Sequence, residues 1–160
     1  MENKMVAKGL QAIVTQLGQQ ADGHMIQSRI FAAAGFSKLA DKYAEHATEE
    51  RGYVSQCIDR MIDLGIEVKL EAKPEGRVCT DPVEWVKYDI QVSKDGLAGL
   101  GPIVEASRTD YATYDILKNY YEDEKEDLYW GGHSSSSSRR SASRTGSSSR
   151  SRRRSHDHCS

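Results

Sequence analysis

One long helical stripe constrains the fold of this chain more than any other feature. Between Gly35 and Gly65, apolar or aromatic side chains recur three or four residues apart, which is the spacing of one face of an α-helix. The stripe consists of Leu39, Tyr43, Tyr53, Cys57, Met61 and Leu64. The two glycines mark the ends of a helix of about eight turns. A helix of this kind buries its apolar face against other helices, so the pattern indicates a helical bundle.

A carboxylate interrupts this stripe. Glu50 lies seven residues after Tyr43 and seven before Cys57, so it shares their face of the helix. A carboxylate on a core-facing stripe has to be paired, protonated or bound to a metal. Glu50 is therefore the first candidate functional residue.

Three further helices are predicted, at about residues 3–33, 82–106 and 111–130, the last ending at Gly131. Asp81 and Pro82 form a typical helix start, with Asp as the N-cap and Pro at the first helical position. Residues 66–80 contain Pro and Gly and read as a connection. Fifteen residues can run the full length of a bundle. The sequence therefore predicts an all-α, antiparallel four-helix bundle with a long crossover between helices two and three.

The composition divides the chain into a bundle of residues 1–130 and a tail of residues 131–160. The tail holds seven Arg, one Asp and thirteen Ser, a net charge of +6, whereas residues 1–130 carry 15 basic and 23 acidic side chains. Such a low-complexity segment cannot build a core, so the tail is predicted to be disordered. Its arginines offer a binding surface for nucleic acid phosphates. Two other interpretations stay open: a solubilising extension, and an out-of-frame or engineered appendage.

No stretch reads as a secretory leader, and no apolar run approaches the roughly 20 residues of a membrane span. A cytoplasmic protein with no membrane partner is the expectation.

A second acidic pair lies on the last predicted helix. Glu124 and Asp127 are three residues apart and share a face, as do Glu50 and Tyr53 on the second helix. Carboxylates that facing helices project into a bundle build di-iron sites, because iron accepts hard oxygen ligands. Spacing alone also fits a solvated face, because Glu124 and Asp127 belong to the acidic run 122–127.

The second helix, with its segments 42–51 and 58–65, resembles that of bacterioferritin-like members of the ferritin superfamily. Residues 111–130, ending Asp-Glu-Lys-Glu-Asp-Leu-Tyr-Trp, are similar to their fourth helix. The resemblance extends over about residues 5–130. It implies a ferritin-like bundle that assembles as a homo-oligomer, oxidises ferrous iron with dioxygen and stores the ferric mineral in a hollow shell.

The resemblance also implies a set of metal ligands: one Glu from each of helices one and three, and a Glu-x-x-His from each of helices two and four. Glu50 and Glu124 match two of these glutamates, while Tyr53 and Asp127 stand at the two histidine positions. Asp127 is an oxygen-donor replacement. Ferroxidase activity is therefore expected to be weakened or lost, and the chain's status as an enzyme stays open.

The remaining positions depart further from the family pattern. Gln91 stands at the helix-three position, and in helix one the alignment gives Leu17 or Gln20, of which only Gln20 has a ligand atom. His24, one turn after Gln20, offers a nitrogen, although a lone inward His is more often a hydrogen-bonded core residue. Arg51 stands where the family has its haem-ligating Met, so no haem is expected. The predicted iron ligands are Glu50, Glu124, Asp127, Gln91, Gln20 and His24.

The sequence leaves two functions open. The first is an iron-binding, iron-storage protein with iron as its expected cofactor, in a di-iron site. The alternative is a non-catalytic structural or nucleic-acid-binding bundle that acts through its basic tail.

Overall fold

The computed structural model describes residues 3–142, with only the backbone described for residues 130–142. Four helices follow one another: α1 (Lys4–Ala33), α2 (Ser37–Asp63), α3 (Pro82–Ala106) and α4 (Tyr111–Ala142). No strand occurs among these residues. The predicted all-α class and the order of the helices are confirmed. Within the same residues, no helix is long and apolar enough to cross a membrane.

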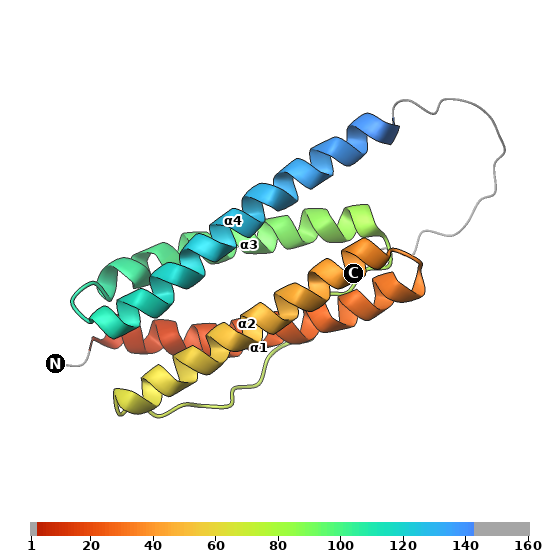
Figure 1. Cartoon of the computed structure of the whole chain (residues 1–160). Coiled ribbons are helices and arrows are strands. Elements are labelled where there is room, and N and C mark those ends of the chain that lie inside the picture. The colour runs from red at the N-terminus through yellow and green to blue at the C-terminus, as the bar shows by residue number, and fades with distance from the viewer. Residues whose placement is uncertain (1–2, 143–160) are drawn as a thin grey trace, which may run out of the picture.

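The helices form two antiparallel hairpins that pack on each other. In Figure 1, α1 and α2 lie together in red to yellow, and α3 and α4 lie together in green to blue. The connection after α2 runs back along the bundle, so that α3 begins near the end where α2 begins (Figure 1). Helices α2 and α3 therefore point the same way, and the predicted long crossover is confirmed.

The helix ends follow the predicted local chemistry. Asp81 accepts hydrogen bonds from the backbone N–H groups of Val83 (2.9 Å) and Glu84 (3.1 Å), which caps α3. Gly35 and Gly65 have φ values of 87° and 71°, a conformation that glycine adopts without the strain of a side chain. These two residues end α1 and α2 as predicted.

The last helix is longer than predicted. Helix α4 continues through Gly131 and Gly132 to Ala142, so the end expected at Gly131 is wrong. A glycine inside a helix costs about 1 kcal/mol relative to alanine, which weakens a helix without interrupting its hydrogen bonds. The rest of the Ser/Arg tail, residues 143–160, lies outside the described residues, and so does most of the predicted nucleic-acid surface.

The core consists of two separate clusters at opposite ends of the bundle. The first, which we call the apolar end, is filled by aliphatic and sulfur-containing side chains: Val6, Leu10, Ile13, Leu17, Cys57, Met61, Leu100, Val104 and Leu117. The second, the aromatic end, contains Phe31, Ala40, Tyr43, Cys79 and Trp85. The chain reverses between α1 and α2 at the aromatic end and between α3 and α4 at the apolar end.

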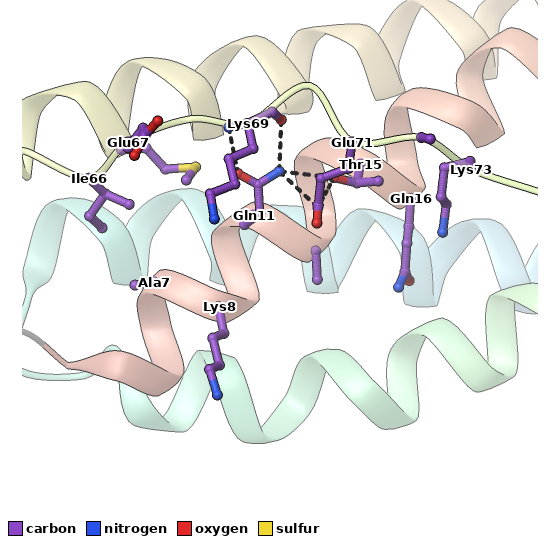
Figure 2. Close-up of a pocket in the computed structure, with 13 residues that line it drawn as sticks. Ala7, Lys8, Gln11, Thr15, Gln16, Ile66, Glu67, Lys69, Glu71 and Lys73 are labelled. Atoms are coloured by element: carbon purple, nitrogen blue, oxygen red, sulfur yellow. Dashed lines mark hydrogen bonds between the residues drawn. The ribbon is translucent and has the colours of Figure 1, made fainter.

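Three glutamines of α1 hold the crossover against the helix. Gln11, Gln19 and Gln27 are eight residues apart along α1, and each forms hydrogen bonds with the crossover. The Gln11 amide accepts from the Lys69 N–H (2.9 Å) and donates to the Lys69 carbonyl (3.0 Å), as Figure 2 shows.

Gln27 holds Cys79 in the same two-bond manner: it accepts from the Cys79 N–H (3.1 Å) and donates to the Cys79 carbonyl (2.5 Å). Gln19 donates to the Pro74 carbonyl (2.6 Å) between these two positions. These hydrogen bonds satisfy backbone groups of a segment that has no secondary structure of its own.

Candidate metal centre

A small cavity lies between the four helices, next to the aromatic end. Its volume is about 70 Å³. Each helix contributes polar side chains to its lining: Gln20 and His24 from α1, Tyr43, His46 and Glu50 from α2, Asp89 and Ser93 from α3, and Glu124 and Asp127 from α4. Polar groups from segments far apart in the sequence therefore converge inside the bundle.

His24 is the centre of this group, and only 2% of its surface is exposed. Its Nδ1 lies 2.5 Å from Glu50 Oε1, and its Nε2 lies 2.8 Å from Asp89 Oδ1. Tyr43 donates its hydroxyl proton to Asp89 Oδ2 at 3.2 Å. Four residues from three helices thus form one continuous hydrogen-bonded chain.

This arrangement fixes the protonation of His24. Burial alone would lower the pKa of the imidazole, but the hydrogen bonds to Asp89 and Glu50 outweigh it and raise the pKa to about 10. Both ring nitrogens then donate to carboxylates, as an imidazolium does. In the absence of a metal, the imidazolium of His24 is therefore held between two carboxyl groups.

The remaining carboxyl oxygens of the cavity are less well partnered. Glu50 is 6% exposed, and its Oε2 has no hydrogen-bond partner. Burial raises the pKa of Glu124 to about 7 in spite of a hydrogen bond with Ser93, and burial also raises the pKa of Asp127. Lys42 also lines the cavity and opposes the rise in the Asp127 pKa, but the carboxyl groups of the lining outnumber its cationic side chains, so the cavity favours a bound cation.

His46 completes the lining on the α2 side. Its ring lies edge-on to His24, with 6.1 Å between the ring centroids, and tilted against Tyr43 at 5.9 Å. Burial and the charge of His24 lower its pKa, so His46 is neutral near pH 7. A neutral imidazole has a free lone pair, as a metal ligand requires.

Five of the six residues predicted from the sequence line this cavity together: Gln20, His24, Glu50, Glu124 and Asp127. Gln91 does not. It lies on the exposed side of α3, where its amide donates to Asp95 at 2.9 Å. Gln91 therefore lies on a different face of α3 from the one that borders the cavity. Asp89, two residues earlier, lines the cavity instead.

The misplaced face of α3 has a clear origin. Gln91 was assigned from the resemblance, whereas in the structure the buried residue of this part of α3 is Trp85, and Val83 is 57% exposed. Asp89 lies one turn after Trp85 and shares its face. The signal that would have identified Asp89 is therefore the tryptophan.

His46 was also missed, although it lies three residues after Tyr43 and four before Glu50, on their side of α2. Tyr53, the residue at the expected histidine position of α2, donates its hydroxyl proton to Asp123. Arg51 pairs with Asp22 at an exposed position.

Comparison with known proteins gives one consistent family. The sequence profile of the ferritin-like domain matches residues 7–133. Bacterial ferritins of Neisseria meningitidis serogroup B and Neisseria gonorrhoeae are each 28% identical over 130 residues, covering 75% of this chain and 83% of the relative. The bacterioferritin of Rhodobacter capsulatus, whose structure was solved with a metal-free dinuclear site and haem iron, superposes with a TM-score of 0.80 at 20% identity over 88% of this chain and 89% of that chain.

Proposed function

Because this chain belongs to the ferritin-like family, we propose that it is an iron-storage protein and that it binds iron ions in the cavity between its four helices. Glu50, Glu124 and Asp127 are the oxygen donors for that iron. All three line the same cavity, and carboxylate oxygens are suitable ligands for iron. The bacterial ferritins that resemble the chain support this proposal by their names.

One observation carries the proposal: the buried, unpartnered Oε2 of Glu50. A buried carboxylate oxygen without a hydrogen-bond partner costs free energy, and proteins rarely retain one without a reason. Here the carboxylate borders a cavity that contains two further carboxyl groups from α4. A bound iron ion offsets the cost for all three groups at once.

We expect the oxidation of Fe²⁺ by dioxygen to be slower than in family members with complete ligands. The expected histidine positions hold Tyr53 and Asp127, and the Tyr53 hydroxyl is engaged by Asp123. The α3 side of the cavity offers Asp89, whose two oxygens bond to His24 and Tyr43. Few donors are therefore free to hold a second iron ion.

The family membership also leads us to propose that the chain assembles as a homo-oligomer, which is the assembly that iron storage requires. The predicted cytoplasmic location stays a prediction. No described residue favours the alternative of nucleic-acid binding.

The test measures iron binding and oxidation in the full-length protein and in four variants. Glu50→Ala and Glu124→Ala each remove a proposed ligand, and we expect both to reduce the bound iron per chain and the rate of ferric absorbance in air. Glu122→Ala is the matched control, because Glu122 is an exposed carboxylate of the same α4 that pairs only with Lys118 at 3.8 Å. Gln91→Ala is a second control, outside the cavity.

Circular dichroism establishes that each variant is folded before iron is added. Equal iron content in Glu122→Ala and Glu124→Ala would contradict the proposal, because iron would then be held by acidic surface and not by the cavity.

A further inference from the structure

We propose that His24, His46 and Glu50 form a mononuclear site for a borderline divalent transition-metal ion such as Zn²⁺. This site is distinct in chemistry from the carboxylate iron site, with which it shares only Glu50. It does not depend on iron storage, and it stands or falls with the two histidines.

The first support is the position of the ligand atoms. One nitrogen of each histidine and one oxygen of Glu50 lie within 4.8 Å of one another. Metal–nitrogen distances of about 2.0–2.1 Å and metal–oxygen distances of about 2.0–2.2 Å place the ligand atoms of a tetrahedral site roughly 3.4 Å apart. All three residues come from the helices α1 and α2, which pack as one hairpin, so reaching this spacing requires the ligand atoms to move closer by rotation of their side chains.

The second support is the way in which His24 is held. Its Nδ1 faces Glu50, and its Nε2 lies 2.8 Å from Asp89, whose other oxygen accepts from Tyr43. A metal-binding histidine usually donates its second N–H to a carboxylate, which fixes the ring and increases the basicity of the ligating nitrogen. Asp89 is positioned for this role, and Tyr43 orients Asp89.

The third support is the unpartnered Oε2 of Glu50, in a residue that is 94% buried since 6% of its surface is exposed. The 2.5 Å contact between Glu50 Oε1 and His24 uses only one oxygen of the carboxylate. A metal ion between Glu50 and the two imidazoles engages the carboxylate from the cavity side and replaces the shared proton.

The donor set determines the class of ion. Two imidazole nitrogens and one carboxylate suit Zn²⁺ or Co²⁺, whereas Mg²⁺ and Ca²⁺ prefer oxygen ligands. Three protein ligands leave a fourth position toward the cavity for a water molecule. The competing interpretation is a purely structural ion pair between His24 and its two carboxylates, and the experiment separates the two.

The probe is Co²⁺, added to the full-length protein after treatment with a chelator. We expect visible d–d absorption and paramagnetically shifted imidazole N–H resonances for two histidines, both removed by Zn²⁺ and unaffected by Mg²⁺. The tail carries His156, His158 and Cys159. The result is therefore read as the signal lost between the natural chain and each variant, and not as total metal.

His46→Ala is the decisive variant. Its side chain is half-buried and makes ring contacts without a role in the hydrogen-bonded chain through His24, so the fold should tolerate its removal. We expect Co²⁺ affinity at this site to fall at least about 100-fold, since the loss of a ligand should exceed the 10–100-fold cost of losing a second-shell group. Asp89→Asn should weaken binding by about 10–100-fold for that second-shell reason.

Glu124→Gln is the control that separates this site from the iron site. It removes a proposed iron ligand and leaves both histidines, so the Co²⁺ spectrum should be retained while iron binding falls. Unchanged Co²⁺ binding in His46→Ala would overturn the proposal. Equal losses in His46→Ala and Glu124→Gln would also overturn it, because they would indicate general attraction by an acidic cavity. Loss of iron binding in Glu124→Gln bears on the proposed function alone.

Discussion

The apolar end of the bundle and the cavity beside the aromatic end are built from the same four helices, but the first is filled by apolar side chains and the second is lined by polar and charged ones. At the apolar end, Leu10, Met61 and Leu117 have no exposed surface and make a dry core. Next to the aromatic end, the same four helices surround His24, Glu50 and Asp89 with a cavity between them. In this bundle the apolar core that stabilises the fold and the polar cavity that could bind a metal therefore lie at different positions along the helices.

This separation has a physical reason. Buried apolar side chains stabilise the fold by about 25 cal/mol for each Å² removed from water, without regard to direction. Buried charges stabilise little and require exact partners. A chain that keeps several carboxylates inside one end therefore depends on the other end for most of its stability.

The largest predicted effect breaks the apolar end. Leu10→Ala should reduce the free energy of unfolding by about 3 kcal/mol, because it removes buried methyl groups and leaves a cavity. The measurement is urea denaturation followed by circular dichroism. Ile26→Ala, at a 51% exposed position of the same α1, is the control and should change stability by less than about 0.5 kcal/mol. Metal binding lost from the folded Leu10→Ala protein would show that the two ends are coupled.

A smaller effect tests the polar link at the apolar end. Asp110 accepts hydrogen bonds from Arg60 of α2 (2.8 Å) and from the Thr113 N–H in the first turn of α4 (3.3 Å). Asp110→Ala should cost about 1.5 kcal/mol, because a helix cap and a link between α2 and α4 are lost together. Asp63→Ala is the control, since its contact with Arg60 is long (4.0 Å) and exposed.

The effect of Asp110 should depend on pH. Burial opposes ionisation, but the bonds from Thr113 and the charge of Arg60 prevail and hold the pKa of Asp110 below its ordinary value of 3.8. The stabilisation is therefore complete above about pH 4 and disappears as the pH falls through the lowered pKa. A difference between the natural chain and Asp110→Ala that does not shrink as the pH falls below 3.8 would contradict this account.

The predicted effect at the cavity has the opposite sign. Burial raises the pKa of Glu124 from 4.5 to about 7, so the folded chain holds a proton that the unfolded chain releases. Stability should therefore fall as the pH rises from about 4.5 to 7 and stay level above that. Glu124→Gln should reduce this slope and, at pH 8 without metal, be more stable than the natural chain by on the order of 3 kcal/mol.

Thermal denaturation of chelator-treated protein at pH 5 and pH 8 measures this difference, with the exposed Glu122→Gln as the matched control. A loss of stability in Glu124→Gln at pH 8 would mean that the ionised carboxylate contributes to the fold. The contrast between the two ends would then be weaker than we infer.

The fold could be predicted well from the sequence because the signals that determine it, the periodicity of apolar residues and the residues that cap or end a helix, are local. The stripe of α2, the Asp81 cap and the glycines at 35 and 65 each specify a helix or its end without reference to other segments. The end of α4 failed for the same reason, because two glycines weaken a helix but do not stop it.

The site was predicted less completely, because it depends on which faces meet. Glu50 and Glu124 lie on stripes that the sequence defines clearly, and both line the cavity. Helix α3 has scattered apolar side chains and several glycines, so its inward face could not be read, and Gln91 was chosen in place of Asp89. In the structure Trp85 packs against Tyr43, with 6.0 Å between their ring centroids, and Asp89 lies one turn later on the same face of α3.

The glutamines at 11, 19 and 27 of α1 have a consequence for the length of the crossover. Gln27, three residues after His24, holds the backbone of Cys79 through two hydrogen bonds. Asp89 follows ten residues after Cys79. The three glutamine contacts thus fix the path of the crossover, which sets the residue at which α3 begins and hence the position of Asp89 relative to the imidazole of His24. Deletion of Thr80, the residue between Cys79 and Asp81, would shorten this connection and displace the start of α3, and with it Asp89, relative to His24.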